Sequence, residues 1–103
     1  MIELLTADTP NGKKISIMLE EIKFDYKLTK ININKDEQFN AEFKKISPFG
    51  KIPVIIDHDA KTSLFESGAI LIYLGEKSGK FYDKGHRTII NQWLMGQMAY
   101  VGP

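Results

Sequence analysis

The residues best suited to chemistry are Glu66 and Ser67, which stand where a strand-like apolar run gives way to a long apolar helix. A helix N-terminus presents unpaired backbone N–H groups and partial positive charge, so it favours a carboxylate or a phosphate. The Glu66 carboxylate beside it suits a ligand that also carries an ammonium group. The segment Leu64–Ile70 therefore predicts a site for an amino-acid head group.

The same residues also fit a purely structural role. Ser63 and Glu66 match the capping-box pattern, in which the serine hydroxyl and the glutamate each satisfy one unpaired N–H of a helix start. Short motifs of this kind recur by chance, so both interpretations stay open until the surrounding elements are considered.

The length and composition are those of one small domain. The 103 residues can bury a modest core, and 43% hydrophobic with 26% charged residues argue against disorder. The net charge of +1, with lysines scattered along the chain, leaves no basic footprint for nucleic acid. No apolar stretch has the length of a membrane span, and Met1–Glu3 lacks a signal-peptide layout. We therefore expect a soluble, cytoplasmic protein with no nucleic-acid or membrane partner.

Metal and disulfide chemistry are not expected from this sequence. The chain has no cysteine, so it has neither a disulfide framework nor a thiolate metal site. His58 and His86 have no second ligand at metal spacing, and both are expected on the surface.

The N-terminal part predicts a strand, a helix and a second strand. Residues 2–6 are apolar on both faces of a strand and should be central in a sheet. A turn at 9–12 leads into an amphipathic helix, and the second strand covers residues 26–32. Two strands joined by a helix should pair in parallel, with a right-handed crossover. The apolar face of the helix carries Ile15, Met18, Leu19 and Ile22.

A second, shorter helix should follow. Phe39, Phe43 and Ile46 are spaced like one face of a helix, which the segment 47–50 then interrupts with a proline and a glycine.

A hairpin and a longer helix complete the predicted sheet domain. The strands cover residues 52–56 and 62–65, and the helix runs over about 66–78 until Gly79 ends it. The order of elements is βαβ followed by αββα. It predicts an α/β protein of thioredoxin-like topology, with a mixed four-stranded sheet.

The last predicted element is an amphipathic helix that begins near Arg87. A small sheet cannot easily cover its apolar face, so we expect another domain or subunit to bury it, or the chain to be a fragment. The apolar residues of this helix are Ile90, Trp93, Leu94, Met98 and Val101.

Four short patterns fall at one end of the predicted sheet: Thr9-Pro10-Asn11, Gln38, Lys51-Ile52-Pro53 and Glu66-Ser67. Together they resemble the glutathione-binding domain of cytosolic glutathione transferases. The residue sequences of these patterns are similar to those of the bacterial YfcG-type, or Nu-class, disulfide-bond reductases. They are also similar to those of the related domain of a fungal prion-forming nitrogen regulator. The resemblance implies that residues 1–80 form this domain. It implies that residues 81–103 form a linker and the first helix of an incomplete helical domain.

The resemblance implies a role for each of these residues toward glutathione. Ser67 and the adjacent helix start would hold the γ-glutamyl carboxylate, and Glu66 would hold the ammonium. Pro53 resembles the family's cis-proline, which would turn the Ile52 backbone outward to pair with the cysteinyl part like an added strand. The alternative for Pro53 is an ordinary edge-strand proline.

Lys51 and Gln38 correspond to the end of the site that takes the glycyl carboxylate. Lys51 would offer its ammonium and Gln38 a second donor. For each residue, a solvated surface side chain is the alternative interpretation.

At the thiol end the sequence departs from the commoner family pattern, because no cysteine or tyrosine follows the first strand. In the subgroup that this chain resembles, the asparagine is the thiol contact, so Asn11 is the first candidate and Thr9 the second. Asn11 could donate an amide N–H and combine it with the positive end of the helix, which favours a thiolate. Asn11 could instead serve only as a helix cap.

The implied activity is glutathione-dependent disulfide reduction, with bound glutathione attacking a disulfide. Transfer of glutathione to an electrophile would use the same thiolate. A non-catalytic binding or regulatory module is the alternative from another class. The implied partners are glutathione, a disulfide or an electrophile, and a second copy of the full-length protein in a homodimer.

Overall fold

The computed structural model describes all residues from 1 to 103 and has the predicted order of elements. The sheet has the strand order β2-β1-β3-β4, with β1 parallel to β2 and antiparallel to β3, which pairs antiparallel with β4. The predicted mixed four-stranded sheet of thioredoxin-like topology is therefore confirmed. The strands are β1 (Ile2–Thr6), β2 (Tyr26–Lys30), β3 (Val54–Asp57) and β4 (Thr62–Phe65).

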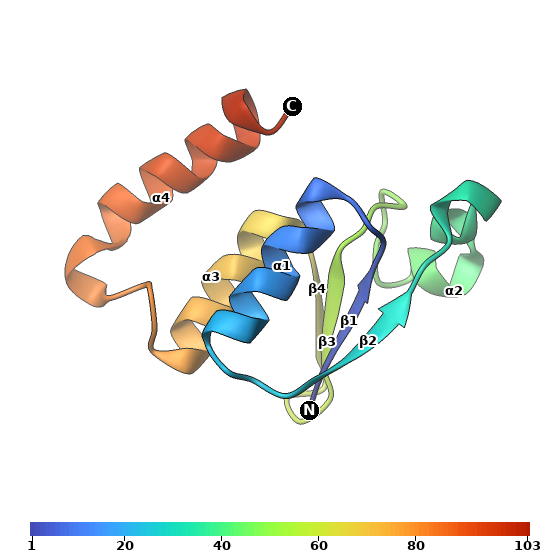
Figure 1. Ribbon diagram of the computed structural model, residues 1–103, viewed down its shortest axis with the longest axis horizontal. Helices are drawn as coiled ribbons and strands as arrows, with labels where there is room; N and C mark the ends of the chain where they lie inside the picture. The colour runs from blue at the N-terminus through green and yellow to red at the C-terminus, as the bar shows by residue number, and fades with distance from the viewer.

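The helices form layers on both faces of this sheet. Figure 1 shows α1 and α3 side by side on one face and α2 beyond the other, with α4 outside the first pair. The longer helices are α1 (Pro10–Glu21), α3 (Ser67–Ser78) and α4 (Arg87–Gly96), and α4 continues into a π-helical turn at Gln97–Val101.

The central strand β1 is apolar on both faces because both are covered. Ile2 and Leu4 face α1 and α3 in the larger core cluster, whereas Leu5 packs with Phe43 and Val54 on the opposite face. The larger cluster is completed by Ile15, Leu19, Ile22, Ile55, Ile70 and Leu74.

The predicted second helix is wrong in its extent. The segment instead forms 3₁₀ turns at Ile33–Lys35 and Glu37–Phe39, then a single helical turn, α2 (Ala41–Lys44). Asn40 has extended backbone angles and caps α2 by accepting from the Glu42 N–H at 2.9 Å. Because the chain bends there, Phe43 is buried whereas Phe39 is 56% exposed.

Two strand boundaries also differ from the prediction. The second strand ends at Lys30 rather than at residue 32, because Asn32 caps the next turn with its side chain. The third strand begins at Val54, so Pro53 lies just before it, where it removes no ladder hydrogen bond.

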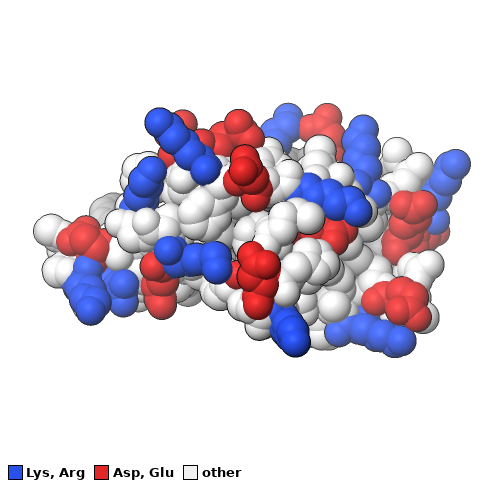
Figure 2. Space-filling view, turned by 90° about the horizontal axis from the view of Figure 1, so that it is seen from below, with Lys and Arg blue, Asp and Glu red and all other residues white.

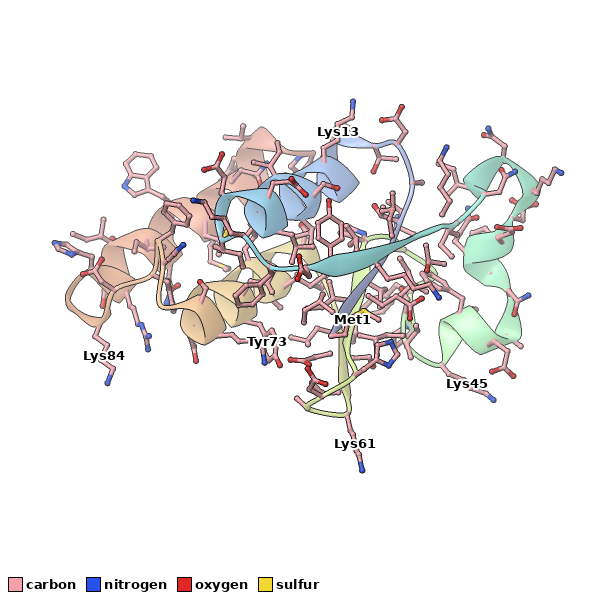
Figure 3. The ribbon with its side chains drawn as sticks, turned by 60° about the horizontal axis from the view of Figure 1, so that its bottom comes forward. Met1, Lys13, Lys45, Lys61, Tyr73 and Lys84 are labelled. Carbon is pink, nitrogen blue, oxygen red and sulfur yellow. The ribbon has the colours of Figure 1, made fainter.

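A buried polar cluster closes the end of the sheet at which β1 begins. Asp57 is fully buried and accepts from the Tyr73 hydroxyl at 2.5 Å and from Lys77 at 3.0 Å. The Tyr73 hydroxyl, with Lys77, holds the pKa of Asp57 at about 2, although burial acts the other way. The same hydrogen bond raises the pKa of Tyr73 to about 12. Figure 3 shows Tyr73 on the side of the molecule where Met1 lies.

The predicted C-terminal helix is confirmed, and much of its apolar side lies open. Trp93 is 78% exposed, and Tyr100 and Val101 in the turn that follows are 86% and 77% exposed. None of the helices combines the length and the apolar character needed to cross a membrane.

Candidate functional site

The start of α1 is held close to the end of β1. Thr9 is its N-cap, with its hydroxyl oxygen accepting from the Gly12 N–H at 3.1 Å, and Pro10 occupies the first helical position. A Cβ on Gly12 would lie 2.2 Å from the Thr6 hydroxyl oxygen, so only glycine allows this approach. Asn11 is therefore not the cap that the alternative interpretation expected. Its side chain is exposed at the first turn of the helix.

The loop before β3 is fixed by one buried serine. The Ser47 hydroxyl donates to the Lys51 carbonyl at 2.6 Å and accepts from the Lys51 N–H at 3.0 Å. The next peptide bond, Ile52–Pro53, is cis. The Ile52 N–H and carbonyl have no hydrogen-bond partner within the chain, so both are free to pair with a ligand.

The capping-box interpretation of the start of α3 is wrong. Ser63 lies in β4, and Glu66 itself is the N-cap residue, without a side-chain capping bond. Glu66 has φ of 72° and ψ of 116°, a backbone conformation that non-glycine residues seldom adopt, and its side chain is exposed. Ser67 begins the helix and is buried. Unusual backbone angles of this kind cluster at ligand-binding sites.

These three segments enclose one pocket of about 290 Å³. Six of the predicted site residues line it. They lie up to 56 positions apart in the sequence. They meet because α1, α3 and the loop before β3 all start at this end of the sheet. The pocket is lined by Asn11, Phe49, Lys51, Ile52, Pro53, Phe65, Glu66 and Ser67.

An adjoining pocket of about 350 Å³ contains the other two predicted residues, Thr9 and Gln38. It shares Asn11, Lys51 and Ile52 with the first pocket, so the two hollows form one continuous surface. All eight predicted residues line it.

Gln38 has an unsatisfied acceptor at this surface. Its side-chain oxygen Oε1 is enclosed and has no hydrogen-bond partner in the chain. A buried polar atom without a partner is costly, so a ligand donor would be favourable there. The expected role of Gln38 was that of a donor, whereas the unpartnered atom is an acceptor.

The pocket offers both signs of charge within a short span. Lys51 and Glu66 both line it, and they do not form an ion pair with each other. Two helix N-termini, of α1 and α3, add partial positive charge. Such a surface can bind a zwitterionic, peptide-like ligand and can favour an anion at either helix start.

Charged side chains of both signs are also distributed elsewhere on the surface. Figure 2 shows lysine, arginine, aspartate and glutamate side chains interspersed over one face of the molecule. His58 contacts Glu3 and His86 contacts Asp83, and no group of three metal-ligating side chains occurs.

Five residues were not predicted as part of the site: Phe49 and Phe65 in the pocket lining, and Lys14, Gln97 and Met98 beside it. Lys14 donates to the Asn11 side-chain oxygen Oδ1 and to the Gln97 side-chain oxygen Oε1, each at 2.8 Å. The Ser67 hydroxyl donates to the Met98 sulfur at 3.6 Å. The turn after α4 therefore contacts both helix starts of the site. No local pattern indicates contacts between residues this far apart in the chain.

Comparison with known proteins identifies the family of this chain. Residues 3–76 match the family model described as glutathione S-transferase, N-terminal domain. The chain is 48% identical over 110 residues to the Escherichia coli disulfide-bond oxidoreductase YfcG, covering 100% of this chain and 51% of that protein. It is 41% identical over 105 residues to protein URE2 of Debaryomyces hansenii, covering 91% of this chain and 33% of the other.

A solved glutathione transferase from Pseudomonas putida, with one glutathione disulfide bound per subunit, superimposes with a TM-score of 0.93. The sequences are 44% identical, and the match covers 99% of this chain and 47% of the other. The chain thus spans about half the length of these bacterial relatives. On the strength of the family model and the fold, this chain belongs to the glutathione S-transferase family.

Proposed function

We propose that this chain binds glutathione in the Asn11–Ser67 pocket and that the protein uses the bound thiol for disulfide exchange. The observation that carries the proposal is the pocket itself, which gathers six predicted residues from three separate segments. Its relatives support the choice of ligand and reaction. One is named a disulfide-bond oxidoreductase, and another has been solved with glutathione disulfide bound.

The γ-glutamyl end of glutathione is assigned to the start of α3. The first N–H groups of the helix suit its carboxylate, and the Ser67 hydroxyl can turn from the Met98 sulfur to donate to it as well. The Glu66 side chain has no hydrogen bond or ion pair within the chain and suits its ammonium.

The middle and the glycyl end are assigned to the loop before β3 and to its neighbour. The unpaired Ile52 N–H and carbonyl suit the cysteinyl backbone, in the manner of an added strand. The Lys51 ammonium suits the glycyl carboxylate, and Gln38, whose enclosed oxygen is unpartnered, suits an N–H beside it.

The thiol is assigned to the start of α1. The Asn11 amide can donate to the sulfur, and the Thr9 hydroxyl keeps a hydrogen to donate while its oxygen accepts from Gly12. Together with the helix's partial positive charge, these donors favour the thiolate, which is the reactive form.

The reaction then proceeds without a cysteine from this chain. The glutathione thiolate attacks one sulfur of a disulfide, forming a mixed disulfide while the other sulfur leaves as a thiolate and takes a proton from water. A second glutathione attacks the mixed disulfide, releasing glutathione disulfide and the second reduced thiol. Two glutathione molecules are oxidised and one disulfide is reduced.

We further propose that residues 1–80 are the glutathione-binding domain and that residues 81–103 begin a helical domain. In the whole protein that domain would line the second-substrate site and take part in a homodimer. Chemistry of this kind suits a compartment with a reducing glutathione pool, such as the cytoplasm.

The test combines binding with turnover. Glutathione and its disulfide are titrated calorimetrically into the chain, and glutathione-dependent reduction of a small disulfide is followed. Asn11→Ala should lower turnover by about tenfold or more while affinity changes less, because its donor acts mainly on the thiolate. Asn34→Ala, at an exposed turn, is the control.

The outcomes separate the candidate functions. Equal losses of turnover and affinity in Asn11→Ala would remove the thiolate role. Binding without turnover on a disulfide or an electrophile would favour a binding module. No binding at millimolar glutathione would overturn the proposal.

A further inference from the structure

Lys14 lies in an unusual place for a cation. It sits on the first turns of α1, where the partial positive charge of the helix start disfavours further positive charge. Its neighbour Lys13 is neutralised by Asp8 at 3.2 Å and projects away from the protein in Figure 3. Lys14 is half-buried and forms no ion pair, so its charge is left uncompensated.

The two partners of Lys14 are neutral amide oxygens from distant segments. The ammonium lies between Asn11 Oδ1 and Gln97 Oε1, at 2.8 Å from each. Gln97 begins the π-helical turn after α4, so this contact ties the C-terminal helix to the start of α1. The Gln97 oxygen therefore holds the Lys14 ammonium on one side, while the ammonium donates to the Asn11 oxygen on the other.

Holding the Asn11 oxygen also orients the Asn11 nitrogen. The oxygen and nitrogen of an amide lie on opposite sides of its carbon, so an oxygen fixed toward Lys14 turns the N–H groups away from Lys14. Asn11 lines the pocket, and this is the direction in which a donor to a ligand sulfur must point. An amide whose oxygen is bound by a cation is also a stronger donor.

The pocket that Asn11 lines has two charged side chains. Lys51 and Glu66 line the same pocket, and the Asp8–Lys13 pair lies at the outer side of α1. Of these, Lys51 and Glu66 are assigned to the charged ends of the ligand. Lys14 is the charge that remains to favour a thiolate at Asn11.

We propose that Lys14 is a positioning residue that fixes the Asn11 amide toward the glutathione sulfur and supports the thiolate with its unneutralised charge. This inference rests on the proposed binding of glutathione. It adds a role for a residue that does not itself line the pocket and acts through Asn11, which does.

The test compares three variants of the whole chain: Lys14→Met, Lys14→Arg and the matched control Lys13→Met. The thiolate absorbance of bound glutathione is titrated against pH, and affinity is measured for S-methylglutathione, whose sulfur cannot ionise. A unit charge separated from the sulfur by one amide side chain changes a pKa by about 0.5 to 1.5 in a partly solvated setting. We therefore expect Lys14→Met to raise the pKa of the bound thiol by about that amount.

The same variant should bind S-methylglutathione within about twofold of the unaltered chain, which also shows that it is folded. Lys14→Arg should restore most of the low pKa, and Lys13→Met should leave it unchanged. Gln97→Leu, which frees Lys14 on one side, should cause part of the Lys14→Met effect.

Two results would overturn the role of Lys14. One is an unchanged thiol pKa in Lys14→Met. The other is a loss of S-methylglutathione affinity as large as the loss of glutathione affinity, which would indicate a structural role only. If the unaltered chain binds neither ligand, the proposed function itself fails, and that outcome is distinct from both.

Discussion

The two ends of the sheet treat polar groups in opposite ways. At the end where β1 begins, Asp57 is fully buried and has partners in Tyr73 and Lys77. At the other end, the Glu66 side chain has no partner, and an acceptor oxygen of Gln38 is enclosed without one.

This difference separates a structural cluster from a binding site. A buried polar group with all its partners stabilises the fold, whereas unpaired groups around a hollow cost stability and are expected where a ligand completes them. Changes at the Asp57 end should therefore alter stability without altering ligand binding. Changes at the Glu66 end should do the reverse.

The largest expected effect is at the structural end. Asp57→Ala leaves Tyr73 and Lys77 without their acceptor and should lower the free energy of unfolding by about 3 kcal/mol. Urea unfolding measures the change, with the exposed Asp59 of the same turn replaced by alanine as the control. Glutathione affinity of the folded fraction should stay the same. A large loss of affinity would break the distinction between the two ends.

Lowering the pH should reduce the contribution of the Asp57 cluster to the free energy of unfolding. The pKa of Asp57 is lowered from 3.8 to about 2 in the folded chain, so its contribution is complete above pH 3.8 and is lost as the pH falls toward 2. The loss should be about 2 kcal/mol. It is measured as the difference in urea unfolding between about pH 5 and about pH 2.5. Asp57→Asn should remove most of this pH dependence, and an equally steep dependence in that variant would assign it to other carboxylates.

At the binding end, Glu66→Gln should act on affinity alone. Losing the charge opposite the ligand ammonium should weaken glutathione binding by about tenfold or more, because hydrogen bonds to charged groups are the stronger ones. Calorimetric titration gives the affinity, and Glu76→Gln, exposed on the same helix, is the control. Unchanged binding would show that Glu66 does not contact the ammonium.

The smallest effect concerns the backbone at Glu66. Its φ of 72° suits glycine, so Glu66→Gly should leave the free energy of unfolding within about 0.5 kcal/mol or raise it slightly. Glu76→Gly, inside α3, should instead lower it by about 1 kcal/mol. Equal losses in the two variants would show that the conformation at Glu66 carries no strain.

The succession of strands and longer helices along the chain follows from local patterns, and the structure confirms it. The i, i+3, i+4, i+7 spacing in α1, the apolar run of β1 and the stop at Gly79 each depend on neighbouring residues alone. The errors lie where two local signals compete. Around Asn40, the apolar spacing favours one helix, but the asparagine cap starts a new turn and breaks it.

The candidate site was predictable as a set of chain positions but not as a set of contacts. The sequence patterns indicated which residues belong at one end of the sheet, and the structure brings them around one surface. They also left a capping box at Ser63 and Glu66 open as an alternative, which the chain does not form. The backbone angle at Glu66 has no signature in residue type.

The sequence by itself determined the family, the order of elements and six of the eight residues that line the pocket, because these depend on spacing and motif within short segments. Only the tertiary structure decided that Lys14 meets Gln97, that Tyr73 meets Asp57 and that Gln38 has an enclosed, unpartnered oxygen. The physical reason is that hydrogen bonding and burial depend on which distant segments pack together. That is settled only when the helices close onto the sheet.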